Sequence, residues 1–196
     1  MSTKTVEDDD EMMLFGLELS EKELYFIGTI VALWGALEYE IFGQTLLALN
    51  PNSIKELPKE MNNMQPSQVL ELWKTHVVDN TAGKRGEVLN KQYQLISHYA
   101  NFRHAIVHGM WDWSPNTPET INVSRVRKDT IQITHFTADD LKDFALELGK
   151  INFKVKYPGG TEDHTRAMVE KGSYMSRRFA AAMTGSPVAD DLFPKI

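Results

Sequence analysis

The spacing of apolar residues along the chain predicts a mainly helical protein with one β-rich insertion. Apolar positions recur at helical spacing over residues 21–49, 67–78 and 87–108, and again over 137–157. Between residues 110 and 136 apolar and polar residues alternate instead, which is typical of strands. We therefore expect an antiparallel bundle of about four to five helices, with a small β-hairpin or sheet inserted after the third long helix.

Capping residues indicate where several of these elements begin and end. Ser20, followed by Glu23 three positions later, is a capping box for the first helix, which Asn50-Pro51 ends. Ser67 is the expected cap of the second helix, and Gly109 lies where a left-handed C-terminal cap glycine follows the third. The remaining expected features are a loop at 51–65, a break at 81–86, a tight turn at Lys128-Asp129 and a helix cap at Thr137.

The compact domain is expected to cover residues 19–157. Residues 1–18 are acidic and then weakly apolar, and we expect a partly disordered N-terminal segment whose apolar half docks on a surface. Residues 158–196 begin with Pro158-Gly159-Gly160 and are expected to form a C-terminal tail, in which the pattern allows one helix at 162–183.

Composition narrows the class of protein. The 196 residues include no cysteine, which excludes disulfides and thiolate metal sites and fits a cytoplasmic location. The N-terminus lacks the basic and apolar regions of a secretory signal. The uncharged run from Leu24 to Leu37 is short of the roughly 20 residues that span a bilayer, so we expect a buried helix and no membrane partner. A net charge of −6 argues against a protein that coats nucleic acid, although one local basic site is compatible with it.

Two of the long helices carry one charge each within their apolar face. At 100° per residue, Arg103 lies at the centre of the apolar stripe of the third helix, and Glu38 lies at the centre of the stripe of the first. An unpaired guanidinium in such a place is costly, so we expect the two helices to pack together with Glu38 holding Arg103. A purely structural ion pair that fixes helix register is the alternative interpretation.

His108 adds chemistry to this arrangement. It follows Arg103 after four intervening residues, at the expected end of the helix, and the two side chains lie about 140° apart around the helix axis. They can therefore flank the mouth of a groove. An acid/base that titrates near neutral pH beside a fixed cation meets the needs of phosphodiester cleavage, in which protons move and negative charge develops.

The segment Arg103-His104-Ala105-Ile106-Val107-His108 resembles the R-x4–6-H motif of HEPN domains, including the polar residue directly after the arginine. The long first helix with an internal acid, Trp34 through Glu38, also resembles that family, and the resemblance covers roughly residues 20–157. The sequence differs from that of one toxin branch of the family, because Met110 stands where that branch has a tyrosine.

The resemblance implies a helical bundle that forms a homodimer, with two Arg–His motifs meeting in one composite active site. Catalytic members are metal-independent endoribonucleases that leave a 2′,3′-cyclic phosphate and a 5′-hydroxyl, often as toxins or phage-defence effectors with an antitoxin or regulatory protein. By position, Arg103 would stabilise phosphate charge and His108 would act as acid or base. His104 would be a secondary polar residue, and Glu38 would orient Arg103. No cofactor or metal is implied.

Two other interpretations stay open at this point. His104 and His108 are spaced to chelate a metal from one helix face, and a third ligand would come from His76, His98 or His135. The chain could also be a non-catalytic HEPN-like module that keeps the motif for dimerisation or for binding a nucleotide or a partner protein.

Basic and aromatic residues outside the motif give weaker indications. Arg125, Arg127 and Lys128 form the best basic cluster, either solvated surface or a guide for RNA phosphates. The four tryptophans are expected to be structural, with two in the helical core (Trp34, Trp73) and two on one strand face packed against a helix (Trp111, Trp113).

Overall fold

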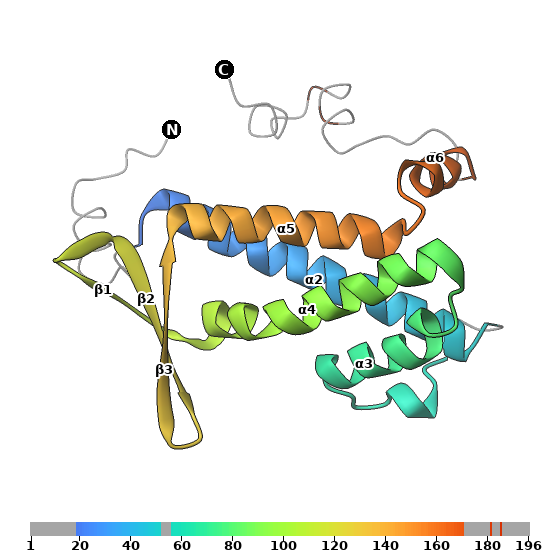
Figure 1. Ribbon diagram of the computed structural model, residues 1–196, viewed down its shortest axis with the longest axis horizontal. Helices are drawn as coiled ribbons and strands as arrows, with labels where there is room; N and C mark the ends of the chain where they lie inside the picture. The colour runs from blue at the N-terminus through green and yellow to red at the C-terminus, as the bar shows by residue number, and fades with distance from the viewer. Residues whose placement is uncertain (1–18, 52–55, 171–180, 182–184, 186–196) are drawn as a thin grey trace. The chain divides into compact units, whose positions relative to one another are not determined.

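The computed structural model describes residues 19–51, 56–170, 181 and 185. The expected N-terminal segment 1–18, and the expected helix 162–183 beyond Glu170, fall largely outside the described residues. The described chain is mostly helical with one small antiparallel sheet, which confirms the mainly helical content and the inserted sheet that the sequence predicted (Figure 1). It divides into two units at Pro158 and Gly159. The first unit contains α2 (Glu21–Leu49), η1 (Lys59–Met61), α3 (Pro66–Trp73), η2 (Lys74–Val78), α4 (Gly83–His108), β1 (Met110–Ser114), β2 (Thr117–Arg127), β3 (Thr130–Thr137) and α5 (Ala138–Lys156), and the second contains α6 (Thr161–Glu170).

The helix ends follow local capping chemistry. Both hydrogen bonds of the predicted Ser20–Glu23 capping box are present, and Thr137 forms a second capping box with Asp140 at the start of α5. Two boundaries differ from the prediction. Helix α3 starts at Pro66 with Gln65 as its N-cap, because proline fits the first turn of a helix. Helix α4 starts at Gly83, so the predicted break over 81–86 is shorter than expected.

The sheet confirms the predicted strands. Its order is β1-β2-β3, with both pairs antiparallel, and Lys128 adopts φ 54° in the turn between β2 and β3. Alternation places Ile121 and Val123 on one face of β2, and both side chains are buried. This strand packs against α4. In the chain, α4 is followed by β1 and then by β2.

Gly109 does not adopt the predicted left-handed cap conformation. Its φ of −80° and ψ of 160° are extended values that any residue adopts. Glycine is needed there because β2 packs against the chain. A Cβ atom at this position would lie 2.1 Å from Cγ1 of Val123 and 2.6 Å from the Ala105 carbonyl oxygen. The close approach fixes how the sheet joins the last turn of α4.

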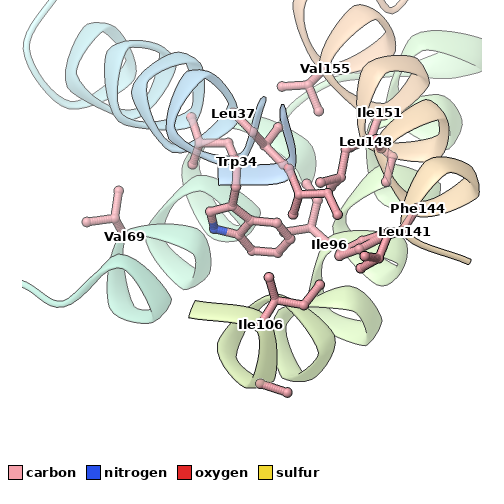
Figure 2. Packing of buried hydrophobic residues seen from close by; sticks show 14 of the residues in the cluster. Trp34, Leu37, Val69, Ile96, Ile106, Leu141, Phe144, Leu148, Ile151 and Val155 are labelled. Atoms are coloured by element: carbon pink, nitrogen blue, oxygen red, sulfur yellow. The ribbon is translucent and has the colours of Figure 1, made fainter. Parts of the chain in front are cut away.

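The helices surround a continuous apolar core, which Figure 2 shows from close by. At their N-terminal ends, α2 and α5 are joined by Lys22 Nζ and Asp139 Oδ1 at 2.9 Å. Near their C-terminal ends, Gln44 Nε2 donates to the Val155 carbonyl oxygen at 3.0 Å. These two helices therefore run in the same direction, which departs from the antiparallel packing that the sequence predicted. Helix α4 runs in the opposite direction to both (Figure 1).

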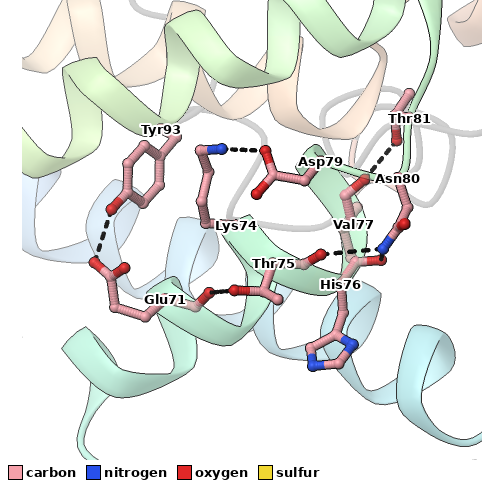
Figure 3. Close-up of polar contacts among 9 residues, drawn as sticks. All are labelled: Glu71, Lys74, Thr75, His76, Val77, Asp79, Asn80, Thr81 and Tyr93. Carbon is pink, nitrogen blue, oxygen red and sulfur yellow. Dashed lines mark hydrogen bonds and ion pairs between the residues drawn. The ribbon is translucent and has the colours of Figure 1, made fainter.

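Polar contacts fasten α3 and η2 to α4 (Figure 3). The Tyr93 hydroxyl on α4 donates to Glu71 Oε1 on α3 at 2.7 Å, and this hydrogen bond, followed by burial, raises the pKa of Tyr93. Lys74 pairs with Asp79 across the single π-helical turn η2 and also lies 5.7 Å from the centre of the Tyr93 ring. The contacts hold α3 beside α4 and so fix one wall of the cleft described below.

Helix α2 is, among the described residues, the one helix long and apolar enough to cross a membrane. Core helices of soluble proteins meet the same criterion. In this fold Ile30, Trp34, Leu37 and Ile41 of α2 are buried against the other elements of the core.

Candidate functional site

A cleft of about 570 Å³ lies between α2, α3 and α4 and contains the predicted motif. Arg103, His104 and His108 of α4 line it together with Glu38 of α2. The four residues that the sequence singled out from two helices are therefore brought into one cleft. Apolar side chains form most of the remaining wall, including Leu37, Ile41 and Ile96.

The contact between Arg103 and Glu38 is looser than predicted. Arg103 Nη2 lies 3.8 Å from Glu38 Oε1, beyond hydrogen-bond distance. Glu38 Oε1 instead accepts a hydrogen bond from Trp34 Nε1 at 2.8 Å, and the Arg103 guanidinium lies 5.9 Å from the centre of the Trp34 ring. Arg103 Nε is buried and has no hydrogen-bond partner among the described residues. The weak contact with Glu38 therefore leaves the guanidinium with one buried N–H donor unsatisfied by the described residues.

Arg103 also lies nearer the edge of the buried face of α4 than the helical-wheel prediction placed it. Its side chain is 26% exposed. Ala105 is buried although it lies on the far side of the predicted stripe, whereas Val107, predicted inside the stripe, is 38% exposed. The sheet offers a reason, because β2 also packs against α4, with Val123 close to Gly109 at the end of the helix. The buried stripe therefore rotates at the end of the helix.

The two histidines of the motif are neighbours. Their ring centroids are 4.6 Å apart at an interplanar angle of 52°. Burial lowers the pKa of His104, and the positive charges of Arg125, His108 and Arg103 lower it further. His104 therefore favours its neutral form near neutral pH, in which one ring nitrogen accepts a proton.

The three residues of the predicted basic cluster lie at different places along the β2–β3 hairpin. Arg125 lies close enough to His104 to act on its pKa, which links β2 to the motif. Lys128 lies exposed in the turn, and Arg127 pairs with Thr130 in the ladder while its side chain is outside the described residues. Of the three, Arg125 is the residue whose charge acts on His104, although it does not line the cleft itself.

A metal site on the two histidines gains no support from the described residues. No group of three histidine or carboxylate side chains suited to a metal ion occurs among them. Two of the expected third ligands have other neighbours. The ring of His98 meets Tyr99 edge-on and lies tilted against Phe102, and His135 Nδ1 lies 2.6 Å from Asn122 Oδ1.

The tryptophans are placed largely as predicted. Trp34 and Trp73 are buried in the core, and Trp73 Nε1 donates to Gln44 Oε1 at 2.8 Å. Trp111 packs partly buried against the core, whereas Trp113 is 40% exposed.

Sequence reasoning missed the third wall of the cleft. Met64, Gln65 and Ser67 line it from the start of α3, in segments that the sequence marked only as loop and helix cap. No local signal could have found them, because their position beside Arg103 depends on how α3 packs against α2 and α4.

Comparison of the chain with models of protein families, with curated proteins and with solved structures finds no match. The resemblance to HEPN domains therefore depends on the sequence motif and the acid in the first helix.

Proposed function

We propose that this protein is a metal-independent endoribonuclease of the HEPN type. In this proposal the packed helices α2, α3, α4 and α5 correspond to the helical bundle of that family. The supporting observation is the meeting of Arg103, His104 and His108 in one cleft, which they line together from α4. Such a group offers both proton transfer and charge stabilisation to an RNA phosphodiester.

The histidines have different roles in the proposed reaction. A neutral histidine takes the proton of the 2′-hydroxyl, whose oxygen attacks the adjacent phosphorus. The P–O5′ bond breaks, and a protonated histidine gives its proton to the leaving 5′-oxygen. The products are a 2′,3′-cyclic phosphate and a 5′-hydroxyl, with one proton taken up and one released. The lowered pKa of His104 suits it to be the base, which leaves His108 as the acid.

The short distance between the two rings favours a dimeric site. Attacking and leaving oxygens lie roughly in line on opposite sides of the phosphorus, so base and acid approach from opposite sides. Two hydrogen bonds of about 2.8 Å with a phosphoryl group between them need more room than a 4.6 Å centroid separation gives. In the proposed enzyme the base of one protomer therefore works with the acid of a second, in a composite cleft.

Arg103 and Arg125 supply positive charge in the proposal. Arg103 donates to the non-bridging phosphate oxygens as negative charge develops, and Glu38 with Trp34 orients it. Arg125 attracts the neighbouring phosphate. The substrate is RNA in the cytoplasm, and an antitoxin or other regulatory protein would control the activity.

The test uses the full chain and total RNA in the presence of EDTA. We expect cleavage by the wild-type protein, and a loss of at least about a hundredfold in Arg103→Ala and His108→Ala. His98→Ala is the matched control, because His98 is an exposed histidine on the same helix that does not line the cleft. It should cut at the wild-type rate.

Product ends and oligomeric state complete the test. Cleaved RNA should carry cyclic phosphate ends, and a substrate with 2′-deoxyribose at the cut position should remain intact. A folded dimer that binds RNA without cutting it would contradict the enzyme and favour the non-catalytic module. Cleavage by a strict monomer would contradict the composite site.

A further inference from the structure

A second concave surface lies on another part of the molecule, between α2 and α5. This groove of about 630 Å³ has an apolar floor that includes Phe26, Leu33 and Ala145. Tyr25 and Leu146, which also line it, are 66% and 55% exposed. Contiguous apolar surface of this kind marks a docking surface, because covering it removes apolar area from water at about 25 cal/mol per Å².

The charges at the groove have one sign. Lys142, Lys150 and Lys154 of α5 are among its lining residues, and no carboxylate is. Lys150 also pairs with Glu147, one turn away on the same helix. An occupant that matches the groove therefore combines apolar side chains for the floor with negative charge for the lysines.

The chain itself contains a segment of that composition. Residues 7–11 are Glu-Asp-Asp-Asp-Glu, and residues 12–17 are Met-Met-Leu-Phe-Gly-Leu. They lie outside the described residues, and only Glu18 separates them from Leu19, which packs partly buried against the core. We propose that the α2–α5 groove is the docking site for residues 7–17 of the same chain, with the apolar part on the floor and the acidic part facing the lysines.

The lengths agree with this assignment. From Lys142 to Lys154, twelve residue steps along α5, the helix rises about 18 Å. Six extended residues span about 20 Å, so residues 12–17 reach along the groove and bring the acidic run to the Lys150 and Lys154 end. The ion pair between Lys22 and Asp139 places the start of α5 beside the start of α2, where the segment joins the helix. Such a tether gives a local concentration in the millimolar range.

A cysteine-pair experiment on the full chain tests the proposal, since the natural sequence has no cysteine that could interfere. Met13→Cys is combined with Leu146→Cys in the groove. The control pair combines Met13→Cys with Lys91→Cys, an exposed position on α4 that does not line the groove. After mild oxidation at micromolar protein, we expect the groove pair to form a disulfide within one chain at least about tenfold faster than the control pair.

The charge match has its own test. Lys150→Glu with Lys154→Glu should slow the cross-link several-fold, and adding Asp8→Lys with Asp9→Lys should restore it. Equal rates for the groove and control pairs would overturn the proposal. So would disulfides found only in covalent dimers, which would assign the groove to the segment of a second copy, and a cross-linking rate that ignores the charge changes. Circular dichroism confirms that each variant is folded. None of these results depends on RNA cleavage.

Discussion

Replacing Gly109 by alanine tests how the sheet and the candidate site depend on each other. The change adds one methyl group at the single residue between the end of α4 at His108 and the start of β1 at Met110. Backbone conformation opposes it little, because the φ of −80° suits any residue. All of the cost should therefore come from packing, which makes the outcome easy to interpret.

The structure gives the size of the clash. The new Cβ would lie 2.1 Å from Val123 Cγ1, about 1.3 Å inside the 3.4 Å where ordinary contact begins. Val123 cannot move into solvent, because its side chain is fully buried and valine has stiff rotamers. Overpacking of this kind costs about 1–3 kcal/mol. We expect Gly109→Ala to lower the free energy of unfolding by that amount and to shift His108 within the cleft, with loss of the proposed RNA cleavage.

Urea unfolding followed by circular dichroism measures the stability change. Gly35→Ala is the matched control, because a Cβ on this helical glycine meets nothing within 4 Å and should stabilise by about 0.5–1 kcal/mol. A double-mutant cycle with Val123→Ala should show a coupling of about 1 kcal/mol or more, since the second change removes Cγ1. An unfolding free energy of Gly109→Ala within about 0.5 kcal/mol of the wild type, or zero coupling, would refute the packing account.

Three further predictions concern the site and the sheet. Glu38→Gln keeps an acceptor for Trp34 Nε1 and removes a partly exposed pair at 3.8 Å, so urea titration should show a loss below about 1 kcal/mol; a larger loss would mean that the pair is closer in solution. Thr137→Ala removes the acceptor for Asp140 N–H and should cost about 1 kcal/mol of unfolding free energy in the same assay; a neutral change would contradict the capping role. The pKa of His104 is lower in the folded chain than in the unfolded one, so the unfolded chain binds more protons below about pH 6.5. Stability should therefore fall as the pH drops from 6.5 towards the folded pKa, and His104→Gln should show a smaller fall over pH 5–7.5; equal slopes would contradict the assigned shift.

Local chemistry accounts for the parts of the fold that the sequence predicted. The Ser20–Glu23 and Thr137–Asp140 capping boxes act within four residues, so the helix starts could be read directly. Strand alternation and the Lys128 turn are equally local. The parallel course of α2 and α5 was not predictable in this way, because these helices are distant in sequence. Their relative direction depends on the path of the chain through α4 and the three strands that precede α5.

Tertiary packing accounts for what the prediction of the site missed. The helical wheel treated α4 as facing one partner, and so placed Arg103 at the centre of a single stripe. The sheet adds a second partner at the end of the helix, where Ala105 is buried and Val107 is exposed. Arg103 then lies near the cleft mouth, where Glu38 is too distant for a hydrogen bond. A wheel calculated from sequence contains no information about that second partner.

The same packing changes how the two histidines should be weighed. Position in the motif made His104 secondary and His108 the acid or base, because the resemblance carried no information about β2. The hairpin brings Arg125 towards His104, and the added positive charge, together with burial, disfavours its protonated form. A histidine kept neutral beside cations is a poor proton donor and remains available as an acceptor. If the cleft cuts RNA, the base is therefore expected at His104, and the inserted sheet has a chemical role in addition to its structural one.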